Sequence, residues 1–299
     1  MKLASSRTRL ALLLVAFASA GAWTVAEQPP AGSPIELVRR AVQNEIRASN
    51  DTANYMFRVR KETPHGSQTR LMVETRDAMA AILVAIDDHP LTVKQREAEN
   101  ARMQRLLNDP DGLRRKHKQE KEDAERVIRI VKALPDALLY EYDGTEAGTP
   151  GVGKPGDELV RLKFRPNPHY EPPSRVEQVL TGLRGYIPID TNKDRLAKID
   201  GTLAKDVGFG WGILGHLDRG GHFLVEQGEV SNDYWEINRM DLSFTGKILF
   251  FKGINIKSSE VYGDFRPVPP NLTFAQGVEL LRKQEAMLAD NRQQNGEDK

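Results

Sequence analysis

Residues 206–227 read DVGFGWGILGHLDRGGHFLVEQ, and this stretch predicts a β-sheet packed closely around glycine. Bulky apolar side chains alternate with glycine along its first half, which is the two-residue period of a β-strand. The apolar members of this strand are Val207, Phe209, Trp211 and Ile213. Glycine weakens the interior of a strand, so alternating glycines indicate close backbone packing or a sharp bend. A turn at 218–221 then predicts that residues 222–227 return as the neighbouring strand.

Alternating apolar and polar residues continue on both sides of this stretch. We expect further strands at residues 54–60, 69–76, 79–86, 137–142, 159–164, 176–184, 185–190, 196–203, 234–244, 247–256 and 262–268. Short turns join the first three, which predicts an antiparallel meander. Thr245 and Gly246 predict the turn between the two longest strands. The sequence therefore indicates an α+β fold whose main element is an antiparallel sheet.

The N-terminal helix is predicted over residues 33–49. Ser33, Pro34 and Glu36 form a capping-box pattern in which Ser33 is the N-cap residue. Apolar residues then recur at three- and four-residue spacing, which is the pattern of an amphipathic helix with one apolar stripe. Such a helix needs a surface to cover, and the sheet is the surface available.

A charged helical hairpin is predicted over residues 91–134, inserted between strands and ended by Pro135. It contains a basic cluster made of Arg114, Arg115, Lys116, His117 and Lys118. This cluster is suited to phosphates or anionic head groups. Acidic residues follow at once, however, and such mixed charge is typical of a solvated helix face.

The N-terminus has the pattern of a secretory signal peptide. A basic segment with Lys2, Arg7 and Arg9 precedes an apolar run at 10–20, which is too short to span a bilayer. Small residues allow cleavage after Ala20 or Ala26. Cleavage after Ala26 removes three positive charges and no acid, which changes the net charge from +1 to −2. We expect a periplasmic or secreted protein, and the lack of a basic excess argues against nucleic-acid binding.

The chain contains no cysteine. It therefore forms no disulfide, and it lacks the residue that a lipoprotein anchor modifies. We expect a signal peptide at 1–26, one domain at 34–290 that contains the insertion at 91–134, and a disordered tail at 291–299. A final helix from about residue 273 completes the domain. We expect a monomer that is at most peripheral to membranes.

Polar site candidates fit ordinary structural roles. His216, His222 and Glu226 are the best metal trio, but their spacing matches no usual zinc pattern. The acidic candidates are Asp190, Asp194, Asp200 and Asp206, which lie near turns where aspartate is common for its own hydrogen bonds. Motifs of serine hydrolases, zinc proteases and phosphate-binding loops are absent from the sequence. We expect no metal, no cofactor and no catalytic residue.

The apolar face of the sheet is the remaining candidate site. Its predicted ligand-binding residues are Val207, Phe209, Trp211, Ile213, Phe223, Val225, Phe244 and Phe251, with Leu242 beside them. Two interpretations stay open for this face. The helix at 33–49 covers it completely and makes an ordinary core, or the two layers leave an apolar cavity.

The order of these elements resembles the LolA-like half-barrel superfamily, which contains periplasmic carriers of outer-membrane lipoproteins, their receptors and relatives that bind acyl chains. The resemblance covers about residues 34–270 and rests on Tyr55-Met56-Phe57-Arg58 after the first helix, on the strand at 185–190 and on the long closing strands. It implies a curved half-barrel sheet with the N-terminal helix against its concave face. It also implies lipid uptake on that face. The charged insertion is larger than these carriers lead us to expect.

The sequence thus predicts an exported, non-enzymatic protein that binds a lipid, an acyl chain or a lipidated partner in an apolar half-barrel cavity, with envelope lipoprotein transport as one role. One alternative is an envelope interaction or sensor module with a filled core, which uses the helical insertion as its contact surface. A less favoured alternative is a hydrolase that uses strand-end carboxylates such as Asp190 or Asp206.

Overall fold

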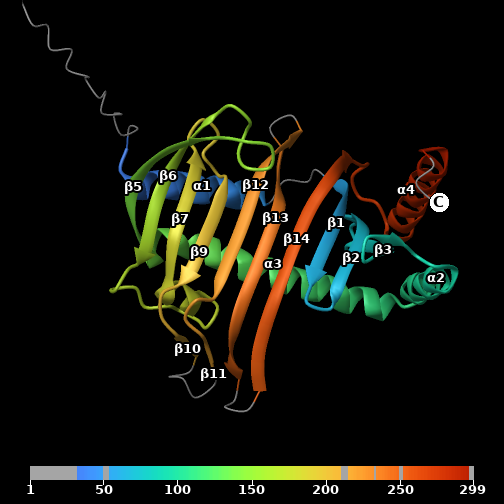
Figure 1. The fold of residues 1–299 in the computed structure, drawn as a ribbon, viewed down its shortest axis with the longest axis horizontal. Helices are drawn as coiled ribbons and strands as arrows, with labels where there is room; N and C mark the ends of the chain where they lie inside the picture. The colour runs from blue at the N-terminus through green and yellow to red at the C-terminus, as the bar shows by residue number, and fades with distance from the viewer. Residues whose placement is uncertain (1–31, 50–53, 210–214, 232–233, 249–251, 296–299) are drawn as a thin grey trace, which may run out of the picture. The chain divides into compact units, whose positions relative to one another are not determined.

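The main element of the fold is an open antiparallel sheet (Figure 1). The computed structural model describes residues 32–49, 54–209, 215–231, 234–248 and 252–295. Its strands are β1 (Tyr55–Thr63), β2 (Gly66–Val73), β3 (Ala80–Ile86), β4 (His89–Pro90), β5 (Leu138–Ala147), β6 (Glu158–Pro166), β7 (Leu183–Asp190), β8 (Arg195–Leu196), β9 (Lys198–Leu203), β10 (Val207–Phe209), β11 (Gly215–Leu217), β12 (His222–Ser231), β13 (Tyr234–Ile248) and β14 (Lys252–Pro267). The helices are α1 (Pro34–Ala48), α2 (Val93–Leu107), α3 (Pro110–Ala137), the 3₁₀ helix η1 (Glu177–Gly182) and α4 (Phe274–Asn295). The expected signal peptide at 1–26 lies outside the described residues.

The strands follow the order β4-β3-β2-β1-β14-β13-β12-β9-β7-β6-β5, and β10, β11 and β8 pair beside this path. The ends of the path, β4 and β5, are not neighbours, so the sheet does not close into a barrel. This confirms the predicted α+β half-barrel. The early meander joins the late strands through β1 and β14, where Tyr55 lies opposite Pro267. Among the described helices, none is both long and apolar enough to cross a bilayer.

The first core lies on the face of the sheet that we call the inner face. It is the face on which α1 and α3 pack, and both helices lie behind the strands in Figure 1. Helix α1 contributes Leu37, Val38, Ala41 and Val42, and the strands contribute Leu138, Val160, Leu162, Phe164, Leu183, Ile187, Ile189 and Leu203. The capping box at Ser33 and Glu36 is present, as predicted. It starts α1 where its apolar stripe meets these strands.

A second core lies on the opposite face, which we call the outer face. Cross-strand partners share a face, so the ladder from Phe223 through Leu242 to Ser258 stays on the inner face. Alternation along β14 keeps Tyr262 there, and Tyr262 pairs with Val59 of β1. The second core is formed by the alternate side chains of the first three strands, which point to the outer face: Met56, Leu71, Val73, Ala80 and Ile82. Helix α4 covers this core with Phe274, Val278 and Leu281. The two ends of the sheet are therefore covered on opposite faces.

The glycine-rich stretch differs from its prediction. Of the expected strand, residues 207–209 are described and form β10, residues 210–213 lie outside the described residues, and β10 pairs with β11 rather than with β12. The turn at 218–221 is present, but it leads from β11 to β12, and β12 pairs with β9 and β13. Gly246 explains why β11 lies close to β13. A Cβ atom at Gly246 would stand 2.2 Å from the His216 carbonyl oxygen, so only glycine fits this approach.

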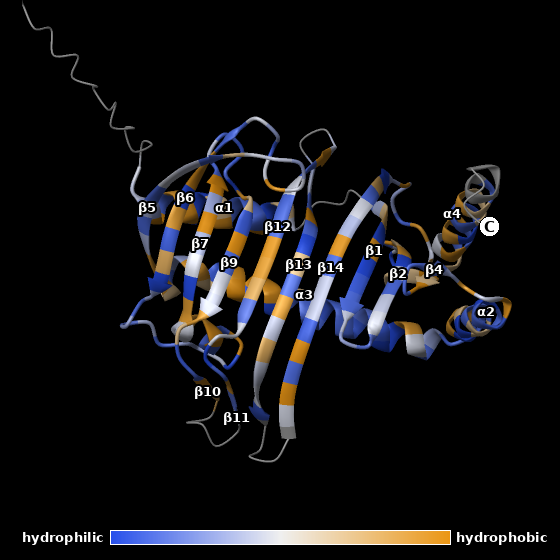
Figure 2. Cartoon of the chain, in the orientation of Figure 1, coloured by the Kyte–Doolittle hydropathy of each residue, from blue (hydrophilic) through white to orange (hydrophobic). Residues whose placement is uncertain are grey.

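The longest hairpin also differs. A turn was expected at Thr245 and Gly246, but both residues lie inside β13, which continues to Ile248. Thr245 and Gly246 pair there with Asn255 and Ile254 of β14. The glycine marks the close approach of a neighbouring strand and not a reversal of the chain. Figure 2 shows hydrophobic and hydrophilic residues alternating along β13 and β14.

Residues 176–184 were expected to form a strand but contain η1. Leu180 and Leu183 are both buried, and their three-residue spacing suits a 3₁₀ turn. Pro135 also does not end its helix, because α3 continues to Ala137. A proline this near the C-terminus removes a single hydrogen bond from the last turn.

The helical insertion is confirmed as helical. Helix α2 packs beside α3, β3 and α4, and the C-terminal end of α3 packs against α1, η1 and β5. Helix α4 continues through Asn295, so residues 291–295 of the expected tail are helical.

Helix α1 is attached to the sheet through the carboxylate of Glu45, whose side chain is 13% exposed. Glu45 accepts two hydrogen bonds from the Arg195 guanidinium, at 2.9 and 3.0 Å, and one from the Leu196 backbone N–H at 3.0 Å. The side-chain amide of Gln227 donates a further bond at 2.7 Å. The Arg195 guanidinium also stacks on Trp235, 5.2 Å from the ring centroid. A charge pair that is largely removed from water loses its hydration, and several hydrogen-bond donors around the carboxylate are needed to offset that cost.

Replacing Glu45 by alanine should lower the free energy of unfolding by about 3–5 kcal/mol, because Arg195 would remain buried without its partner. Equilibrium unfolding in urea at pH 7 measures this loss. The matched control is Arg40→Ala, which breaks the exposed ion pair with Asp194 and should cost less than about 1 kcal/mol. Equal losses in both variants would contradict the anchoring role of Glu45.

Candidate functional site

An apolar strip lies open on the inner face of the middle strands. We define this open apolar strip as Phe223 and Val225 of β12, Met240, Leu242 and Phe244 of β13, and Ile256 of β14. The register places Phe223 opposite Leu242, and Val225 opposite Met240. Phe244 lies opposite Ile256, so the six side chains are contiguous. Five of them are half-buried, and Ile256 is 46% exposed.

Helix α3 crosses behind these strands (Figure 1). Its C-terminal end is held in the first core by Leu134 and Ala137. Near the other end, the Glu120 carboxylate accepts a hydrogen bond of 3.0 Å from the Met79 backbone N–H. Every residue from 121 to 127 is exposed, and Val127 is 59% exposed. The segment of α3 from 121 to 127 is therefore largely open to solvent.

The structure brings part of the predicted site together. Phe223, Val225 and Phe244 belong to the open apolar strip. Phe209 is half-buried against the first core, and Val207 is only 2% exposed within that core. The remaining predicted residues, Trp211, Ile213 and Phe251, lie outside the described residues.

The sequence interpretation did not include Met240 and Ile256 in the site. The period-two pattern of β13 contains Met240, which lies two residues before Leu242 on the same face. Ile256 was missed because the turn between the two long strands was expected at residues 245–246. A reversal at 245–246 would have set Lys247 opposite Phe244, whereas the observed register sets Ile256 there.

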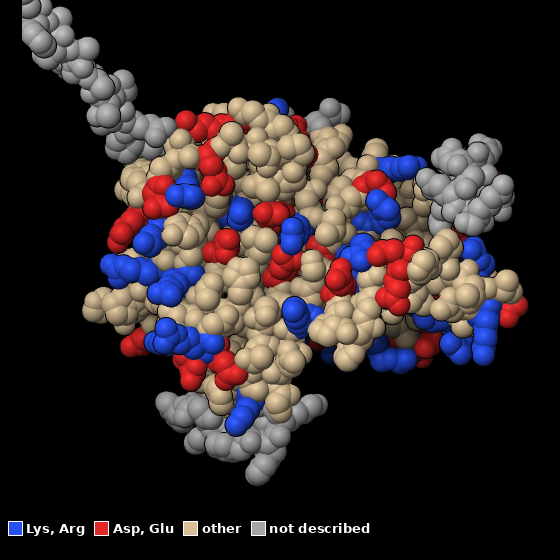
Figure 3. Space-filling model, in the orientation of Figure 1, with Lys and Arg blue, Asp and Glu red and all other residues tan. Residues whose placement is uncertain are grey.

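The outer face of the same strands is charged, and Figure 3 shows basic and acidic side chains interspersed across it. Lys198 and Glu226 lie 3.5 Å apart, and the Arg239 and Asp241 side chains lie 2.8 Å apart. Such a surface is typical of solvent contact. The middle strands therefore combine a solvated outer face with an apolar inner face.

The basic cluster of the insertion is paired within its own helix. Arg114 pairs with Asp111, and Lys116 with Glu120. Lys118 lies 3.9 Å from Glu122. These pairs at three- and four-residue spacing favour the interpretation of a solvated helix face.

The histidines take part in separate contacts. His216 lies 3.1 Å from Asp218, and His222 lies 3.0 Å from Asp200. Glu226 pairs instead with Lys198. In the ranges that the structure describes, no group of three or more metal-ligating side chains comes together.

The aspartates at the strand ends accept hydrogen bonds from backbone N–H groups of nearby turns. Asp190 accepts the N–H groups of Asn192 and Lys193, both at 3.0 Å, and Asp206 accepts the Arg219 N–H at 2.7 Å. Burial raises the pKa of Asp190, and its second carboxylate oxygen has no hydrogen-bond partner. These bonds match the structural role that the sequence suggested for aspartate at turns.

A pair of carboxyl groups lies near the start of β13, where this strand is not yet paired with β14. Pairing between these strands begins at Arg239 and Val261, so the first residues of β13 pair with β12 alone. The ring of Tyr234, in this segment, stacks on the ring of Tyr55, and the two ring centroids lie 4.3 Å apart.

Glu74 and Glu236 are the two carboxyl groups in this region. Burial, reinforced by the nearby charge of Glu236, raises the pKa of Glu74 to about 7. Burial also raises the pKa of Glu236. The pair therefore holds a proton more tightly than isolated carboxylates do.

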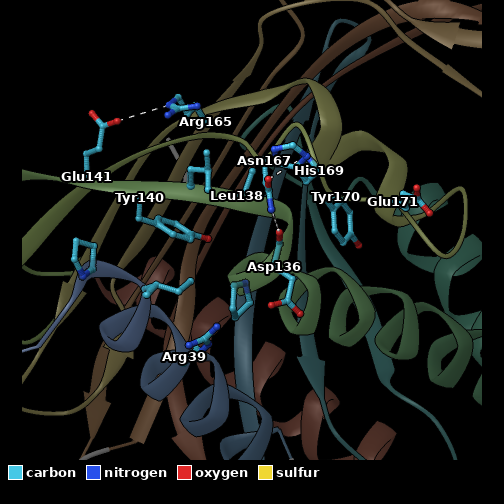
Figure 4. A pocket seen from close by; sticks show the side chains of 14 residues that line it. Arg39, Asp136, Leu138, Tyr140, Glu141, Arg165, Asn167, His169, Tyr170 and Glu171 are labelled. Carbon is cyan, nitrogen blue, oxygen red and sulfur yellow. Dashed lines mark hydrogen bonds and ion pairs between the residues drawn. The ribbon is translucent and has the colours of Figure 1, made fainter.

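A separate hollow of about 670 Å³ opens beside edge strand β5 (Figure 4). Arg39 reaches it from α1, and Asp136 from the end of α3. The segment after β6 contributes His169, Tyr170 and Glu171. The Asn167 side chain ties this segment to α3 by donating to the Asp136 carbonyl oxygen at 2.9 Å.

Comparisons with known proteins give distant structural likenesses. No family model matches the chain, and no curated protein matches it in sequence. A DUF1329 family protein from Desulfovibrio piger is 9% identical, covers 82% of this chain and 97% of its own length, and gives a TM-score of 0.29. MucB, solved in complex with MucA(peri), is 8% identical, covers 79% of this chain and 100% of its own length, and gives a TM-score of 0.22. Because these TM-scores are low, no statement about function follows from them, and the LolA-like resemblance stays a prediction.

Replacing Glu74 by glutamine should stabilise the protein increasingly as the pH rises through about 7. The pKa of Glu74 is raised on folding, so its favourable contribution is complete below its unfolded pKa and is lost as the pH rises through the folded pKa. Glutamine never ionises and avoids that loss. Urea unfolding of both proteins at pH 5 and pH 9 measures the difference.

The control for this experiment is Glu97→Gln, an exposed carboxyl group on α2. It should change the free energy of unfolding little at either pH. A stability difference for Glu74→Gln that is the same at both pH values would show that the pKa of Glu74 is not raised by folding.

Proposed function

We propose that the protein is an exported, non-enzymatic binder of a lipid, an acyl chain or a lipidated partner, and that the apolar chain lies on the open apolar strip. The observation that carries this proposal is the strip itself, because six contiguous apolar side chains remain half-buried or exposed on the inner face of the middle strands. Contiguous apolar surface that stays accessible to solvent is a mark of a binding site.

The geometry suits a flexible apolar chain better than a rigid polar ligand. The strip runs across β12, β13 and β14 and meets the first core at Phe223 and Phe244. An acyl chain on these side chains would exchange water for apolar contact, at about 2.5 kcal/mol for each 100 Å² of apolar surface removed from water. Helix α3 spans the strip between its anchored ends, so an occupant would lie between helix and sheet.

Native mass spectrometry of the protein, purified gently from its own cells, tests for a bound ligand. Adducts that resolve into acyl-containing molecules on denaturation are the expected result. A mass without adducts, together with no uptake of added fatty acid, would remove the proposal and favour a protein-interaction module with a filled core.

Replacing Ile256 by glutamate should weaken binding of a dansyl-labelled fatty acid by at least about tenfold, because a charge would have to be buried against the chain. Fluorescence titration measures the affinity. Val261→Glu is a matched control, since Val261 lies on the outer face of the same strand and is 49% exposed. Equal affinities in the two variants would place the site elsewhere.

A further inference from the structure

The two longest strands separate from each other at one end. Pairing of β13 with β14 begins at Arg239 and Val261. Before that point, residues 234–237 of β13 pair with β12, whereas residues 262–267 of β14 pair with β1. Within the described residues, no strand pairing joins these two segments, which we call the diverging segments. Figure 1 shows the upper ends of the two strands moving apart.

Side chains cross between the diverging segments. The ring of Tyr234, from β13, stacks on the ring of Tyr55, from β1, and we call these two residues the tyrosine stack. The Tyr234 hydroxyl also donates a hydrogen bond to the carboxylate of Glu236. On the other side, the Tyr55 backbone N–H donates to the carboxylate of Glu74, which follows β2. Each side of the stack therefore carries one carboxyl group, and we call Glu74 and Glu236 the carboxyl pair.

The carboxyl pair lies in a region that is largely closed to water and has little positive charge to neutralise it. Trp235, the chain neighbour of Glu236, is 6% exposed. Burial raises the pKa of Glu236, and the charge of Arg195, from β8, offsets only part of this rise. Arg195 already donates two hydrogen bonds to the Glu45 carboxylate. Burial and the charge of Glu236 also raise the pKa of the Tyr234 hydroxyl, which therefore stays protonated at neutral pH.

Ionisation of both members of the carboxyl pair would place two like charges together where water screens them poorly. Burial, reinforced by the charge of Glu236, raises the pKa of Glu74 to about 7, so the second charge appears near neutral pH. Movement of the diverging segments away from each other would return both carboxylates to water. Such a movement breaks no pairing between β13 and β14, because none is present there.

We propose that the diverging segments form a pH-dependent opening, which is closed while the carboxyl pair keeps a proton and opens when both carboxyl groups are ionised. The tyrosine stack favours the closed form, and repulsion between the carboxylates favours the open form. Opening would begin beside Arg239, the chain neighbour of Met240 in the open apolar strip, and would therefore widen access to that strip. This consequence for the strip rests on the proposed function, whereas the opening itself does not.

The direction of the pH effect follows from the raised pKa of Glu74. A carboxyl group whose pKa is raised in the closed form stabilises that form at low pH, and this contribution is lost as the pH rises from 4.5 to about 7. If opening returns Glu74 to its usual pKa of 4.5, the ratio of open to closed molecules should rise by roughly 80-fold between pH 5 and pH 9.

Pulsed electron paramagnetic resonance between two spin labels measures the opening directly. The chain contains no cysteine, so introduced cysteines can be labelled selectively. Ser231→Cys with Arg76→Cys spans the opening, because Ser231 pairs with Tyr234 of β13 and Arg76 follows β2. We expect a longer distance between these labels at pH 9 than at pH 5. The reference pair, Glu62→Cys with Arg76→Cys, lies on one side of the opening and should give the same distance at both pH values.

Replacing both Glu74 and Glu236 by glutamine should remove the pH dependence and give the short distance at pH 5 and at pH 9. Glu97→Gln, an exposed change on α2, should leave the pH dependence intact. Circular dichroism checks that the variants are folded, and Glu74→Gln alone serves the same purpose if the double variant does not fold.

Two results would each overturn the proposal: equal distances at pH 5 and pH 9 in the labelled protein, or a pH-dependent lengthening that persists in the glutamine variants. The measurement needs no ligand. A protein that opens but binds no acyl chain would contradict the proposed function alone, and a protein that binds an acyl chain at a constant label distance would contradict the opening alone.

Discussion

The carboxylate of Glu45 makes the contact on which the layered structure depends. It accepts hydrogen bonds from Arg195, from the Leu196 backbone and from Gln227, so one side chain joins α1 to two separate strands. The apolar stripe of α1 supplies the area of the interface, but area alone does not fix a helix in rotation or translation. A bidentate ion pair does, because its geometry is satisfied in one position only. The inner core beneath α1, and the edge strand next to it, inherit that position.

Strand alternation explains why an apolar strip remains uncovered. Each strand offers two faces, and each helix covers one face of a few strands. Helices α1 and α3 cover the inner face toward β5, whereas α4 covers the outer face toward β3. The middle strands lie between these two coverings. Their outer face is charged and solvated, whereas their inner face carries apolar side chains that are only half-buried or exposed.

The sequence was sufficient for features that depend on neighbours along the chain. The capping box at Ser33, the meander of the first strands and the alternation around Phe223 all followed from local spacing. The errors came from contacts between distant segments. Gly246 suggested a turn, although its real role is to let His216 approach from another strand. The register that follows from the correct hairpin could not be read from either strand alone.

The candidate site shows the same division. Phe223, Val225 and Phe244 were predicted from alternation, whereas Ile256 depended on the register. Glu74 and Glu236 drew no attention, since nothing in their local sequence shows that the two carboxyl groups lie near each other in a buried place.

The pairing of β1 with β14 has a consequence for how the protein is made. Tyr55 reaches its partner Pro267 only after nearly the whole chain has been synthesised. Before that moment the early meander and the later strands are separate pieces, each with an unsatisfied edge. Contacts between residues so distant in sequence carry a large loop-closure cost and slow folding. We expect the last long strand to act as the step that commits the chain to its native sheet, so a ribosome-bound or truncated chain that lacks it would remain open to chaperones and proteases.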